Sequence, residues 1–219
     1  MRKRFIVLLL GSIVVAGTDA QAQTCRGSVP IGRMSHGIVD VGTAFSKYTN
    51  SYGANVGGGS DRWFAGGGIQ GLHYSDLDAR TWAVTGIGGA QIDADAGRYF
   101  MICPMSAVTF ERANAIFGDD VSARTLTLSG GAAVGINAFQ DTMVSLVPTV
   151  GLFVSRASTL VDVAGDRVTV GETYSTLQAG VGVLLGERAS ITPMLVIPIG
   201  LEGGQKTFSL SYAFSFGRR

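Results

Sequence analysis

Acidic residues follow one of the two histidines closely. His73 opens the run His73-Tyr-Ser-Asp-Leu-Asp78, which places Asp76 and Asp78 within five positions. A histidine with nearby carboxylates is the combination that general acid–base hydrolysis uses. A solvated polar turn explains the same run without chemistry. The other histidine, His36, precedes the first expected strand and is expected to be exposed.

Two further groups of carboxylates could in principle hold a divalent cation through oxygen ligands. They are Gly118-Asp-Asp120 and the pair Asp162 and Asp166. Neither has the ligand spacing of a calcium-binding loop, so solvated loop charge is the simpler interpretation. We therefore expect no catalytic site, no cofactor-binding site and no metal site.

The glycine runs 57–59 and 66–68 do not form phosphate-binding loops. No Lys-Ser or Lys-Thr follows them, and no strand–loop–helix pattern surrounds them. They fit close backbone approach and strong strand curvature instead. Asp40 is different, because it is a lone carboxylate within a strand-like stretch and is expected to face inward. It would meet water or an inward arginine there, with an ion pathway as the less favoured interpretation.

The element that must position these residues is the β-strand. Alternation of large apolar and small polar residues is the strand signal, and residues 207–216 show it without interruption. The large residues on one face of this final stretch are Phe208, Leu210, Tyr212, Phe214 and Phe216.

Ten such stretches are predicted along the chain. They cover residues 37–47, 51–58, 62–74, 80–92, 98–110, 124–137, 142–156, 173–185, 190–200 and 207–216. The opposite faces hold Gly, Ala, Ser, Thr, Asn and Gln, which suits a narrow barrel filled by side chains. Pro193 and Pro198 make the ninth stretch the weakest, because proline cannot donate to a strand ladder.

The N-terminus has the pattern of a secretory signal peptide. Met1-Arg-Lys-Arg precedes an apolar run and then Ala20-Gln21-Ala22, with cleavage expected after Ala22. We therefore expect a signal peptide at 1–22, an irregular lead-in or partial plug at 23–35 and the barrel domain at 36–219. Cleavage removes three basic residues and one acidic residue, which changes the net charge from +1 to −1. This balance argues against a nucleic-acid partner.

The strands are expected to carry almost no acidic residues. Beyond the signal peptide, only Asp40 falls inside a predicted strand, whereas soluble sandwiches spread charge along their wet faces. Arginines mark the predicted strand ends, where they can reach lipid headgroups. These are Arg62, Arg80, Arg98, Arg112, Arg124 and Arg156.

The chain is thus exported and sparsely charged, and it has no apolar run long enough for a spanning helix after the signal. Only helices and closed barrels satisfy their backbone groups in lipid. The sequence predicts an all-β fold, an up-and-down antiparallel transmembrane β-barrel of about ten strands, with eight as the fallback. An exported soluble β-sandwich remains the alternative.

The signal peptide, the run Trp63-Phe-Ala-Gly-Gly-Gly68 and the terminal strand resemble the small outer-membrane β-barrel proteins of bacteria with a double membrane. The resemblance implies that the last strand is recognised by the barrel-insertion machinery, although Gly217-Arg218-Arg219 replace the usual terminal aromatic residue. The strand number and the cluster at His73 are also similar to omptin proteases, which implies a rim-type hydrolase as a second possibility.

The function expected from the sequence is structural or adhesive, with a packed lumen instead of an open pore. Partners would be outer-membrane lipid, the insertion machinery and an extracellular ligand of loops 111–123 and 157–172. We expect a monomer in the outer membrane, reached through the general secretory route.

The two cysteines generate a testable prediction. Cys25 and Cys103 are the only cysteines of an exported chain, so we expect one intramolecular disulfide. The bond would close a loop of about 78 residues and stabilise the fold by about 4 kcal/mol in the chain-entropy treatment. Alkylation of non-reduced protein followed by mass measurement should find no modified thiol. Two modified thiols would exclude the bond and the plug together.

Overall fold

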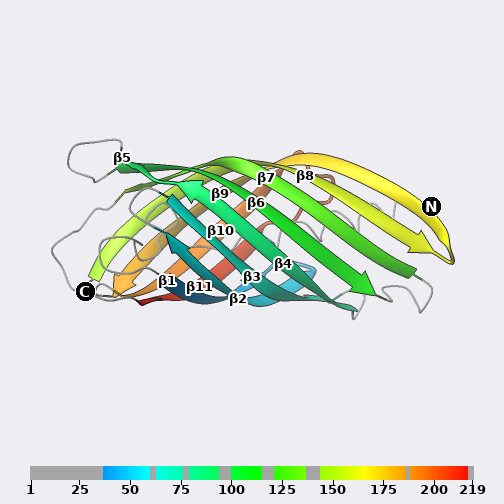
Figure 1. Ribbon diagram of the computed structural model, residues 1–219, viewed down its shortest axis with the longest axis horizontal. Coiled ribbons are helices and arrows are strands. Elements are labelled where there is room, and N and C mark those ends of the chain that lie inside the picture. Colours follow the sequence, from blue (N-terminus) through cyan, green and yellow to red (C-terminus); the bar gives the residue numbers. More distant parts are fainter. Residues whose placement is uncertain are drawn as a thin grey trace.

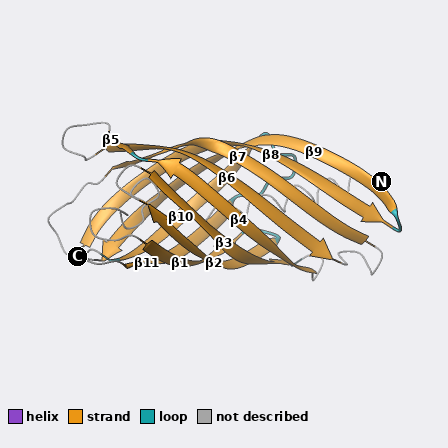
Figure 2. Ribbon diagram, viewed as in Figure 1, coloured by secondary structure: helices purple, strands orange, loops and turns teal. Residues whose placement is uncertain are grey.

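The computed structural model describes residues 37–59, 63–75, 79–93, 100–114, 121–136, 144–185 and 188–216. Ten long strands and one short strand, β5, make up this part (Figures 1 and 2). Their bounds are β1 Gly37–Phe45, β2 Thr49–Gly59, β3 Trp63–Tyr74, β4 Ala79–Ala90, β5 Ile92–Asp93, β6 Phe100–Asn114, β7 Val121–Ile136, β8 Val144–Val163, β9 Asp166–Leu185, β10 Ala189–Ile199 and β11 Thr207–Phe216. Among the described residues, no helix is long and apolar enough to cross a membrane.

The strands close into a barrel. Each long strand pairs antiparallel with its sequence neighbours, and β4 pairs directly with β6. The first and last strands complete the ring, from Gly37 opposite Phe216 to Phe45 opposite Phe208. All strands are tilted relative to the barrel axis (Figure 1). The prediction of a ten-stranded up-and-down antiparallel barrel is confirmed.

Side chains alternate strictly between the two faces of the wall. In β11 the five large apolar residues point outward and are exposed, whereas Thr207, Ser209 and Ser215 point inward and are buried. The same alternation holds in β1 and β2. The ring therefore has a continuous apolar outer surface and an interior of small, polar and a few large side chains.

The interior is packed by side chains from several strands. The largest cluster brings Phe64 of β3, Cys103 of β6 and Phe153 of β8 together with Met101, Met105 and Ala133. Gly131 is needed opposite Phe153, because a Cβ at Gly131 would lie 2.7 Å from the Phe153 ring. A second cluster, near the other end of the barrel, joins Tyr174, Met194, Val196 and Leu201 with Ala157.

The expected loop 157–172 is wrong, and the expected loop 111–123 is wrong at both of its ends. Residues 157–172 form the outer parts of β8 and β9, which pair without a break from Arg156 opposite Thr173 to Val163 opposite Asp166. The turn is Ala164-Gly165, and both residues have positive φ (52° and 95°), as tight hairpin turns require. Of loop 111–123, residues 111–114 end β6 and residues 121–123 begin β7, whereas residues 115–120 lie outside the described residues. Figure 1 shows β8 and β9 extending furthest beyond the other strands on the right.

The placement of charge differs from the expectation as well. Four acidic residues lie within strands, namely Glu111, Asp162, Asp166 and Glu172. Arg156 lies in the middle part of β8 along the chain, with an exposed side chain, instead of at the end of the strand. For Asp162, Asp166 and Glu172 the physical reason is that β8 and β9 continue past the apolar belt, whereas Glu111 is buried inside the barrel. The outward positions of β8 and β9 beyond Arg156 do not face lipid and so tolerate Ser158 and Asp162.

The face assignment predicts different outcomes for three arginine substitutions. Val150 is 47% exposed at the middle of the apolar belt, so Val150→Arg should destabilise the inserted barrel by about 2–4 kcal/mol. Leu128 is also outward but lies opposite Arg156, which follows the last apolar residue of the belt on β8. At this edge of the membrane Leu128→Arg should cost only about 0–1 kcal/mol. Thr127→Arg places the cation in the packed interior, where Thr127 is 7% exposed. Urea unfolding in detergent or lipid measures all three, and equal tolerance would contradict the assigned faces.

Candidate functional site

For the description of the site, the hairpin end of the barrel is the end that carries the β1–β2, β3–β4 and β8–β9 turns. The terminus end is the one that carries Gly37 and Phe216. A carboxylate lies inside the wall near the hairpin end. Glu111 of β6 is 5% exposed, and its Oε1 atom accepts hydrogen bonds from the Tyr74 hydroxyl at 3.0 Å and from the Thr81 hydroxyl at 2.9 Å. These three side chains come from adjacent strands β3, β4 and β6.

The Glu111 cluster pairs a carboxylate with two hydroxyls, as a general base and its nucleophile would be paired. It lacks the access to substrate that catalysis needs. Tyr74 and Thr81 are both buried, so no open position for a substrate adjoins the carboxylate. Among the described residues, no group of three His, Cys, Asp or Glu side chains gathers that could hold a metal ion. What the arrangement does is hold a buried carboxyl group with two donors between three strands.

Sequence reasoning missed Glu111 because it assigned residue 111 to a loop. A usable signal was present, since the outward residues Val108 and Phe110 continue in phase to Arg112. That phase places Glu111 inward with Thr109. The sequence marked this position as a strand end only because the apolar face stops there.

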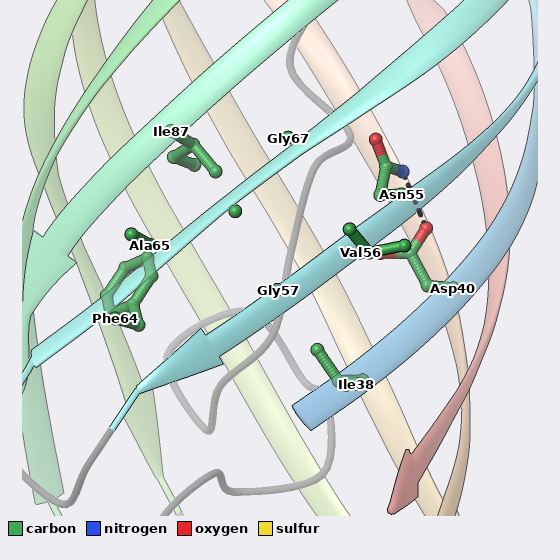
Figure 3. Close-up of a pocket in the computed structure, with 10 residues that line it drawn as sticks. Ile38, Asp40, Asn55, Val56, Gly57, Phe64, Ala65, Gly67 and Ile87 are labelled. Atoms are coloured by element: carbon green, nitrogen blue, oxygen red, sulfur yellow. Dashed lines mark hydrogen bonds between the residues drawn. The ribbon is translucent and has the colours of Figure 1, made fainter. Parts of the chain in front are cut away.

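Asp40, the one carboxylate predicted inside a strand, does face the interior. It is buried and accepts a hydrogen bond from Asn55 Nδ2 at 2.7 Å (Figure 3). The adjoining cavity, lined also by Ile38, Phe64 and Ile87, measures about 10 Å³. That volume holds about one water molecule, so it is a packing space and not a conduit.

His73 lies on the outer face of β3, between Asn50 of β2 and Arg80 of β4. Glu111 is on the other side of the wall, so it cannot act with His73. Asp76 and Asp78, the carboxylates expected beside His73, lie outside the described residues. The described residues therefore assemble no catalytic group around His73, and its Nδ1 atom is buried without a hydrogen-bond partner.

Cys103 faces the interior as expected and is completely buried in the cluster of Phe64, Met101, Met105 and Phe153. Cys25, His36 and residues 1–36 as a whole lie outside the described residues. The disulfide, the lead-in plug and the signal peptide therefore stay predictions. Gly118-Asp-Asp120 also lies outside the described residues.

The carboxylate of Asp162 is used by the β8–β9 turn. Its Oδ2 atom accepts a hydrogen bond from Arg167 Nε at 3.0 Å, and its Oδ1 atom accepts one from the Gly165 amide at 3.1 Å. The hydrogen bond from Arg167 is the main reason that the pKa of Asp162 lies below its ordinary value. Asp162 therefore stabilises the turn, which accounts for it without a bound cation.

The outer part of β9 has an unpaired edge. Pairing of β9 with β10 begins at Ser175, opposite Ile199, whereas pairing with β8 continues to Asp166. In these described strands, residues 166–174 of β9 thus pair on one side only. Val168, in the middle of this edge, is 60% exposed.

The outer surface of the barrel indicates whether lipid or water surrounds it. Large exposed apolar residues occur on every long strand, from Val144 to Val154 on β8 and from Leu126 to Ile136 on β7. Aromatic residues flank this belt, with Trp63, Phe100 and Phe216 near the terminus end and Trp82 beside Phe110 nearer the hairpin end. The fold is a transmembrane β-barrel.

No protein-family model matches the chain, and no curated protein matches it. Solved outer-membrane barrels are similar at low identity. The N-terminal β-barrel domain of Pseudomonas aeruginosa OprF matches at 14% identity and TM-score 0.36, covering 84% of this chain and 98% of that one. The attachment invasion locus protein Ail of Yersinia pestis matches at 11% identity and TM-score 0.40, covering 84% of this chain and 98% of that one.

A bacterial polysaccharide outer membrane secretin matches at 12% identity and TM-score 0.47, covering 77% of this chain. This chain spans only 57% of the length of that secretin chain. Since all three similarities are weak, the fold assignment rests on the strand pairing and the outer surface of the chain itself.

The Glu111 cluster predicts a graded loss of stability. Glu111→Leu removes the acceptor of two buried hydroxyls, so it should destabilise the barrel by about 1–3 kcal/mol for each group left unpaired. Glu111→Gln keeps an acceptor and should cost less, and Tyr74→Phe, which removes one donor, should cost the least. Unfolding midpoints in detergent, followed by the gel shift between folded and heated protein, would show the order. A stability order with Glu111→Gln the worst would contradict the role given to the hydroxyls.

Proposed function

We propose that the chain is an integral protein of a bacterial outer membrane that acts by surface interaction. The β8–β9 hairpin presents the interacting surface, and the terminus end faces the periplasm. The observation that carries the proposal is that these two strands continue past the apolar belt as a paired hairpin with one open edge.

The length of the belt supports a membrane crossing. On β8 the outward residues from Val144 to Val154 are apolar, and Arg156 follows. Eleven residues is the length that a tilted transmembrane strand needs. Beyond Arg156, each arm has about seven more residues, which at about 3.3 Å per residue reach about 20 Å past the membrane surface.

The open edge favours one kind of contact. Unpaired amide and carbonyl groups on an exposed strand bind an extended segment of another protein by adding a strand. Residues 166–171 of β9 are free for this, whereas Tyr174 is already packed against Leu201. An adhesive or other recognition role at the surface fits such an edge.

The interior supports a packed barrel instead of an open porin. Side chains from opposite walls meet in the cluster of Phe64, Cys103 and Phe153, and hydroxyl pairs such as Thr125 and Thr159 join neighbouring strands. A disulfide between Cys103 and Cys25 would add to this filling and is part of the proposal. The last strand, β11, is also proposed to be the segment that the insertion machinery recognises.

The two alternatives fit the described residues less well. A rim-type hydrolase would need carboxylates beside His73, and an active centre of that kind is not proposed. A soluble sandwich would bury its apolar face, whereas Phe208, Leu210 and Tyr212 of this chain are exposed.

Display of the hairpin on intact cells tests the proposal. An epitope inserted between Ala164 and Gly165 should be labelled by antibody without permeabilisation, and the protein should fractionate with the outer membrane. The matched control carries the epitope in the β9–β10 turn beside Arg188, at the terminus end, and should be labelled only after permeabilisation.

A variant that joins Ala157 to Glu172 through Asn-Gly, and so shortens each arm by an even number of residues, should still insert and show the gel shift, since the removed residues pair only with each other and with β7. Recovery of the intact chain in the soluble periplasm, or labelling of the two epitopes in the reverse order, would exclude the proposed function.

A further inference from the structure

The outer wall contains a groove on the side opposite to the hairpin arms in strand order. It measures about 1000 Å³ and crosses β10, β11, β1, β2, β3 and β4. Its floor is made by the small outward residues Thr43, Ala54 and Gly71, and bulky residues surround them. The bulky outward residues are Val41, Tyr52, Ile69, Trp82, Val84, Ile191, Leu210 and Tyr212.

Strand register explains the shape of this groove. Thr43, Tyr52, Gly71 and Trp82 lie directly opposite one another in one row across four strands. The ring of Tyr52 lies over Gly71, since a Cβ at Gly71 would come within 2.9 Å of that ring. Tyr52 thus leans toward β3 and leaves the space above Thr43 and Ala54 open.

The row next to the groove, toward the hairpin end, is apolar at Phe45 on β1 and polar on β2, β3 and β4. It runs from Phe45 through Asn50 and His73 to Arg80, each opposite the next. All four face outward, and the Nδ1 atom of His73 is buried without a partner. Polar side chains therefore begin where the apolar groove ends.

Positive charge continues from this row along the wall. Arg112 of β6 lies opposite Trp82, and Arg124 of β7 lies opposite Arg112. Arg80, Arg112 and Arg124 are thus outward-facing cations on three neighbouring strands.

We propose that this wall binds a lipid with a phosphate headgroup. Its acyl chains occupy the groove over Thr43 and Ala54, and its phosphate lies against His73, Arg80 and Arg112. Guanidinium groups are suited to this because their donors match phosphate oxygens. A membrane lipid is favoured over free phosphate because the cationic row and an apolar groove are continuous on a surface that faces the bilayer.

Retention of lipid by the purified, folded barrel tests the inference. Full-length protein in nanodiscs of dioleoyl phosphatidylcholine with a minor fraction of dioleoyl phosphatidic acid should retain phosphatidic acid preferentially when released for native mass spectrometry. The double variant Arg80→Gln with Arg112→Gln should lower that retention about thirtyfold, as expected for two arginines at a charged lipid surface. Arg188→Gln, an exposed arginine at the terminus end, is the matched control and should retain it fully.

The groove is tested separately. Ala54→Trp fills its floor without changing charge and should also lower retention, whereas soluble inorganic phosphate should not compete. Equal retention of both lipids by the native protein would overturn the inference, and so would competition by phosphate together with an unaffected Ala54→Trp variant. The gel shift of each variant confirms folding. Surface labelling of the Ala164–Gly165 epitope should be unchanged, so failure of the lipid site is distinguishable from failure of the proposed function.

Discussion

The structure depends on the pairing of its first strand with its last. Nine residues of β1, from Gly37 to Phe45, pair with β11, and without this contact both strands would expose a row of amide and carbonyl groups to lipid. Each such group costs several kcal/mol in hydrocarbon. Closure is therefore the condition under which a chain with so little charge and so large an exposed apolar surface exists as a folded protein at all.

Closure also fixes what each side chain can do. Because residues alternate across the wall, an inward position must be filled from inside and an outward one must suit its depth in the bilayer. Glu111 and His73 show the consequence. They come from neighbouring parts of the barrel, yet Glu111 is enclosed with Tyr74 and Thr81 while His73 faces outward beside Arg80. A wall one residue thick separates them, and this excludes joint chemistry more firmly than distance along the sequence does.

The parts of the fold that touch lipid were predictable, and those that extend past it were not. Strand 207–216 was predicted with its observed bounds because lipid requires a large apolar residue at every second position of β11. The outer parts of β8 and β9 do not face lipid, so Ser158 and Asp162 can occupy outward positions. The sequence pattern there therefore predicted a loop. Of the candidate sites, the inward direction of Asp40 was predictable from its neighbours Val39 and Val41. The Glu111 cluster was not, because it depends on three strands that only the register brings together.

Register also explains how the hairpin can vary while the barrel stays the same. Between Arg156 and the turn, β8 and β9 pair with each other, and β7 is the one other strand that pairs with them. Removing opposed residues two at a time from each arm preserves the facing of all that remain. Removing a single residue from β8 would turn Phe153 toward lipid or Val150 toward the interior, depending on which end shifts. Surface length is therefore adjustable in steps of two, and the constraint comes from the alternation of the wall and not from the ligand that the hairpin meets.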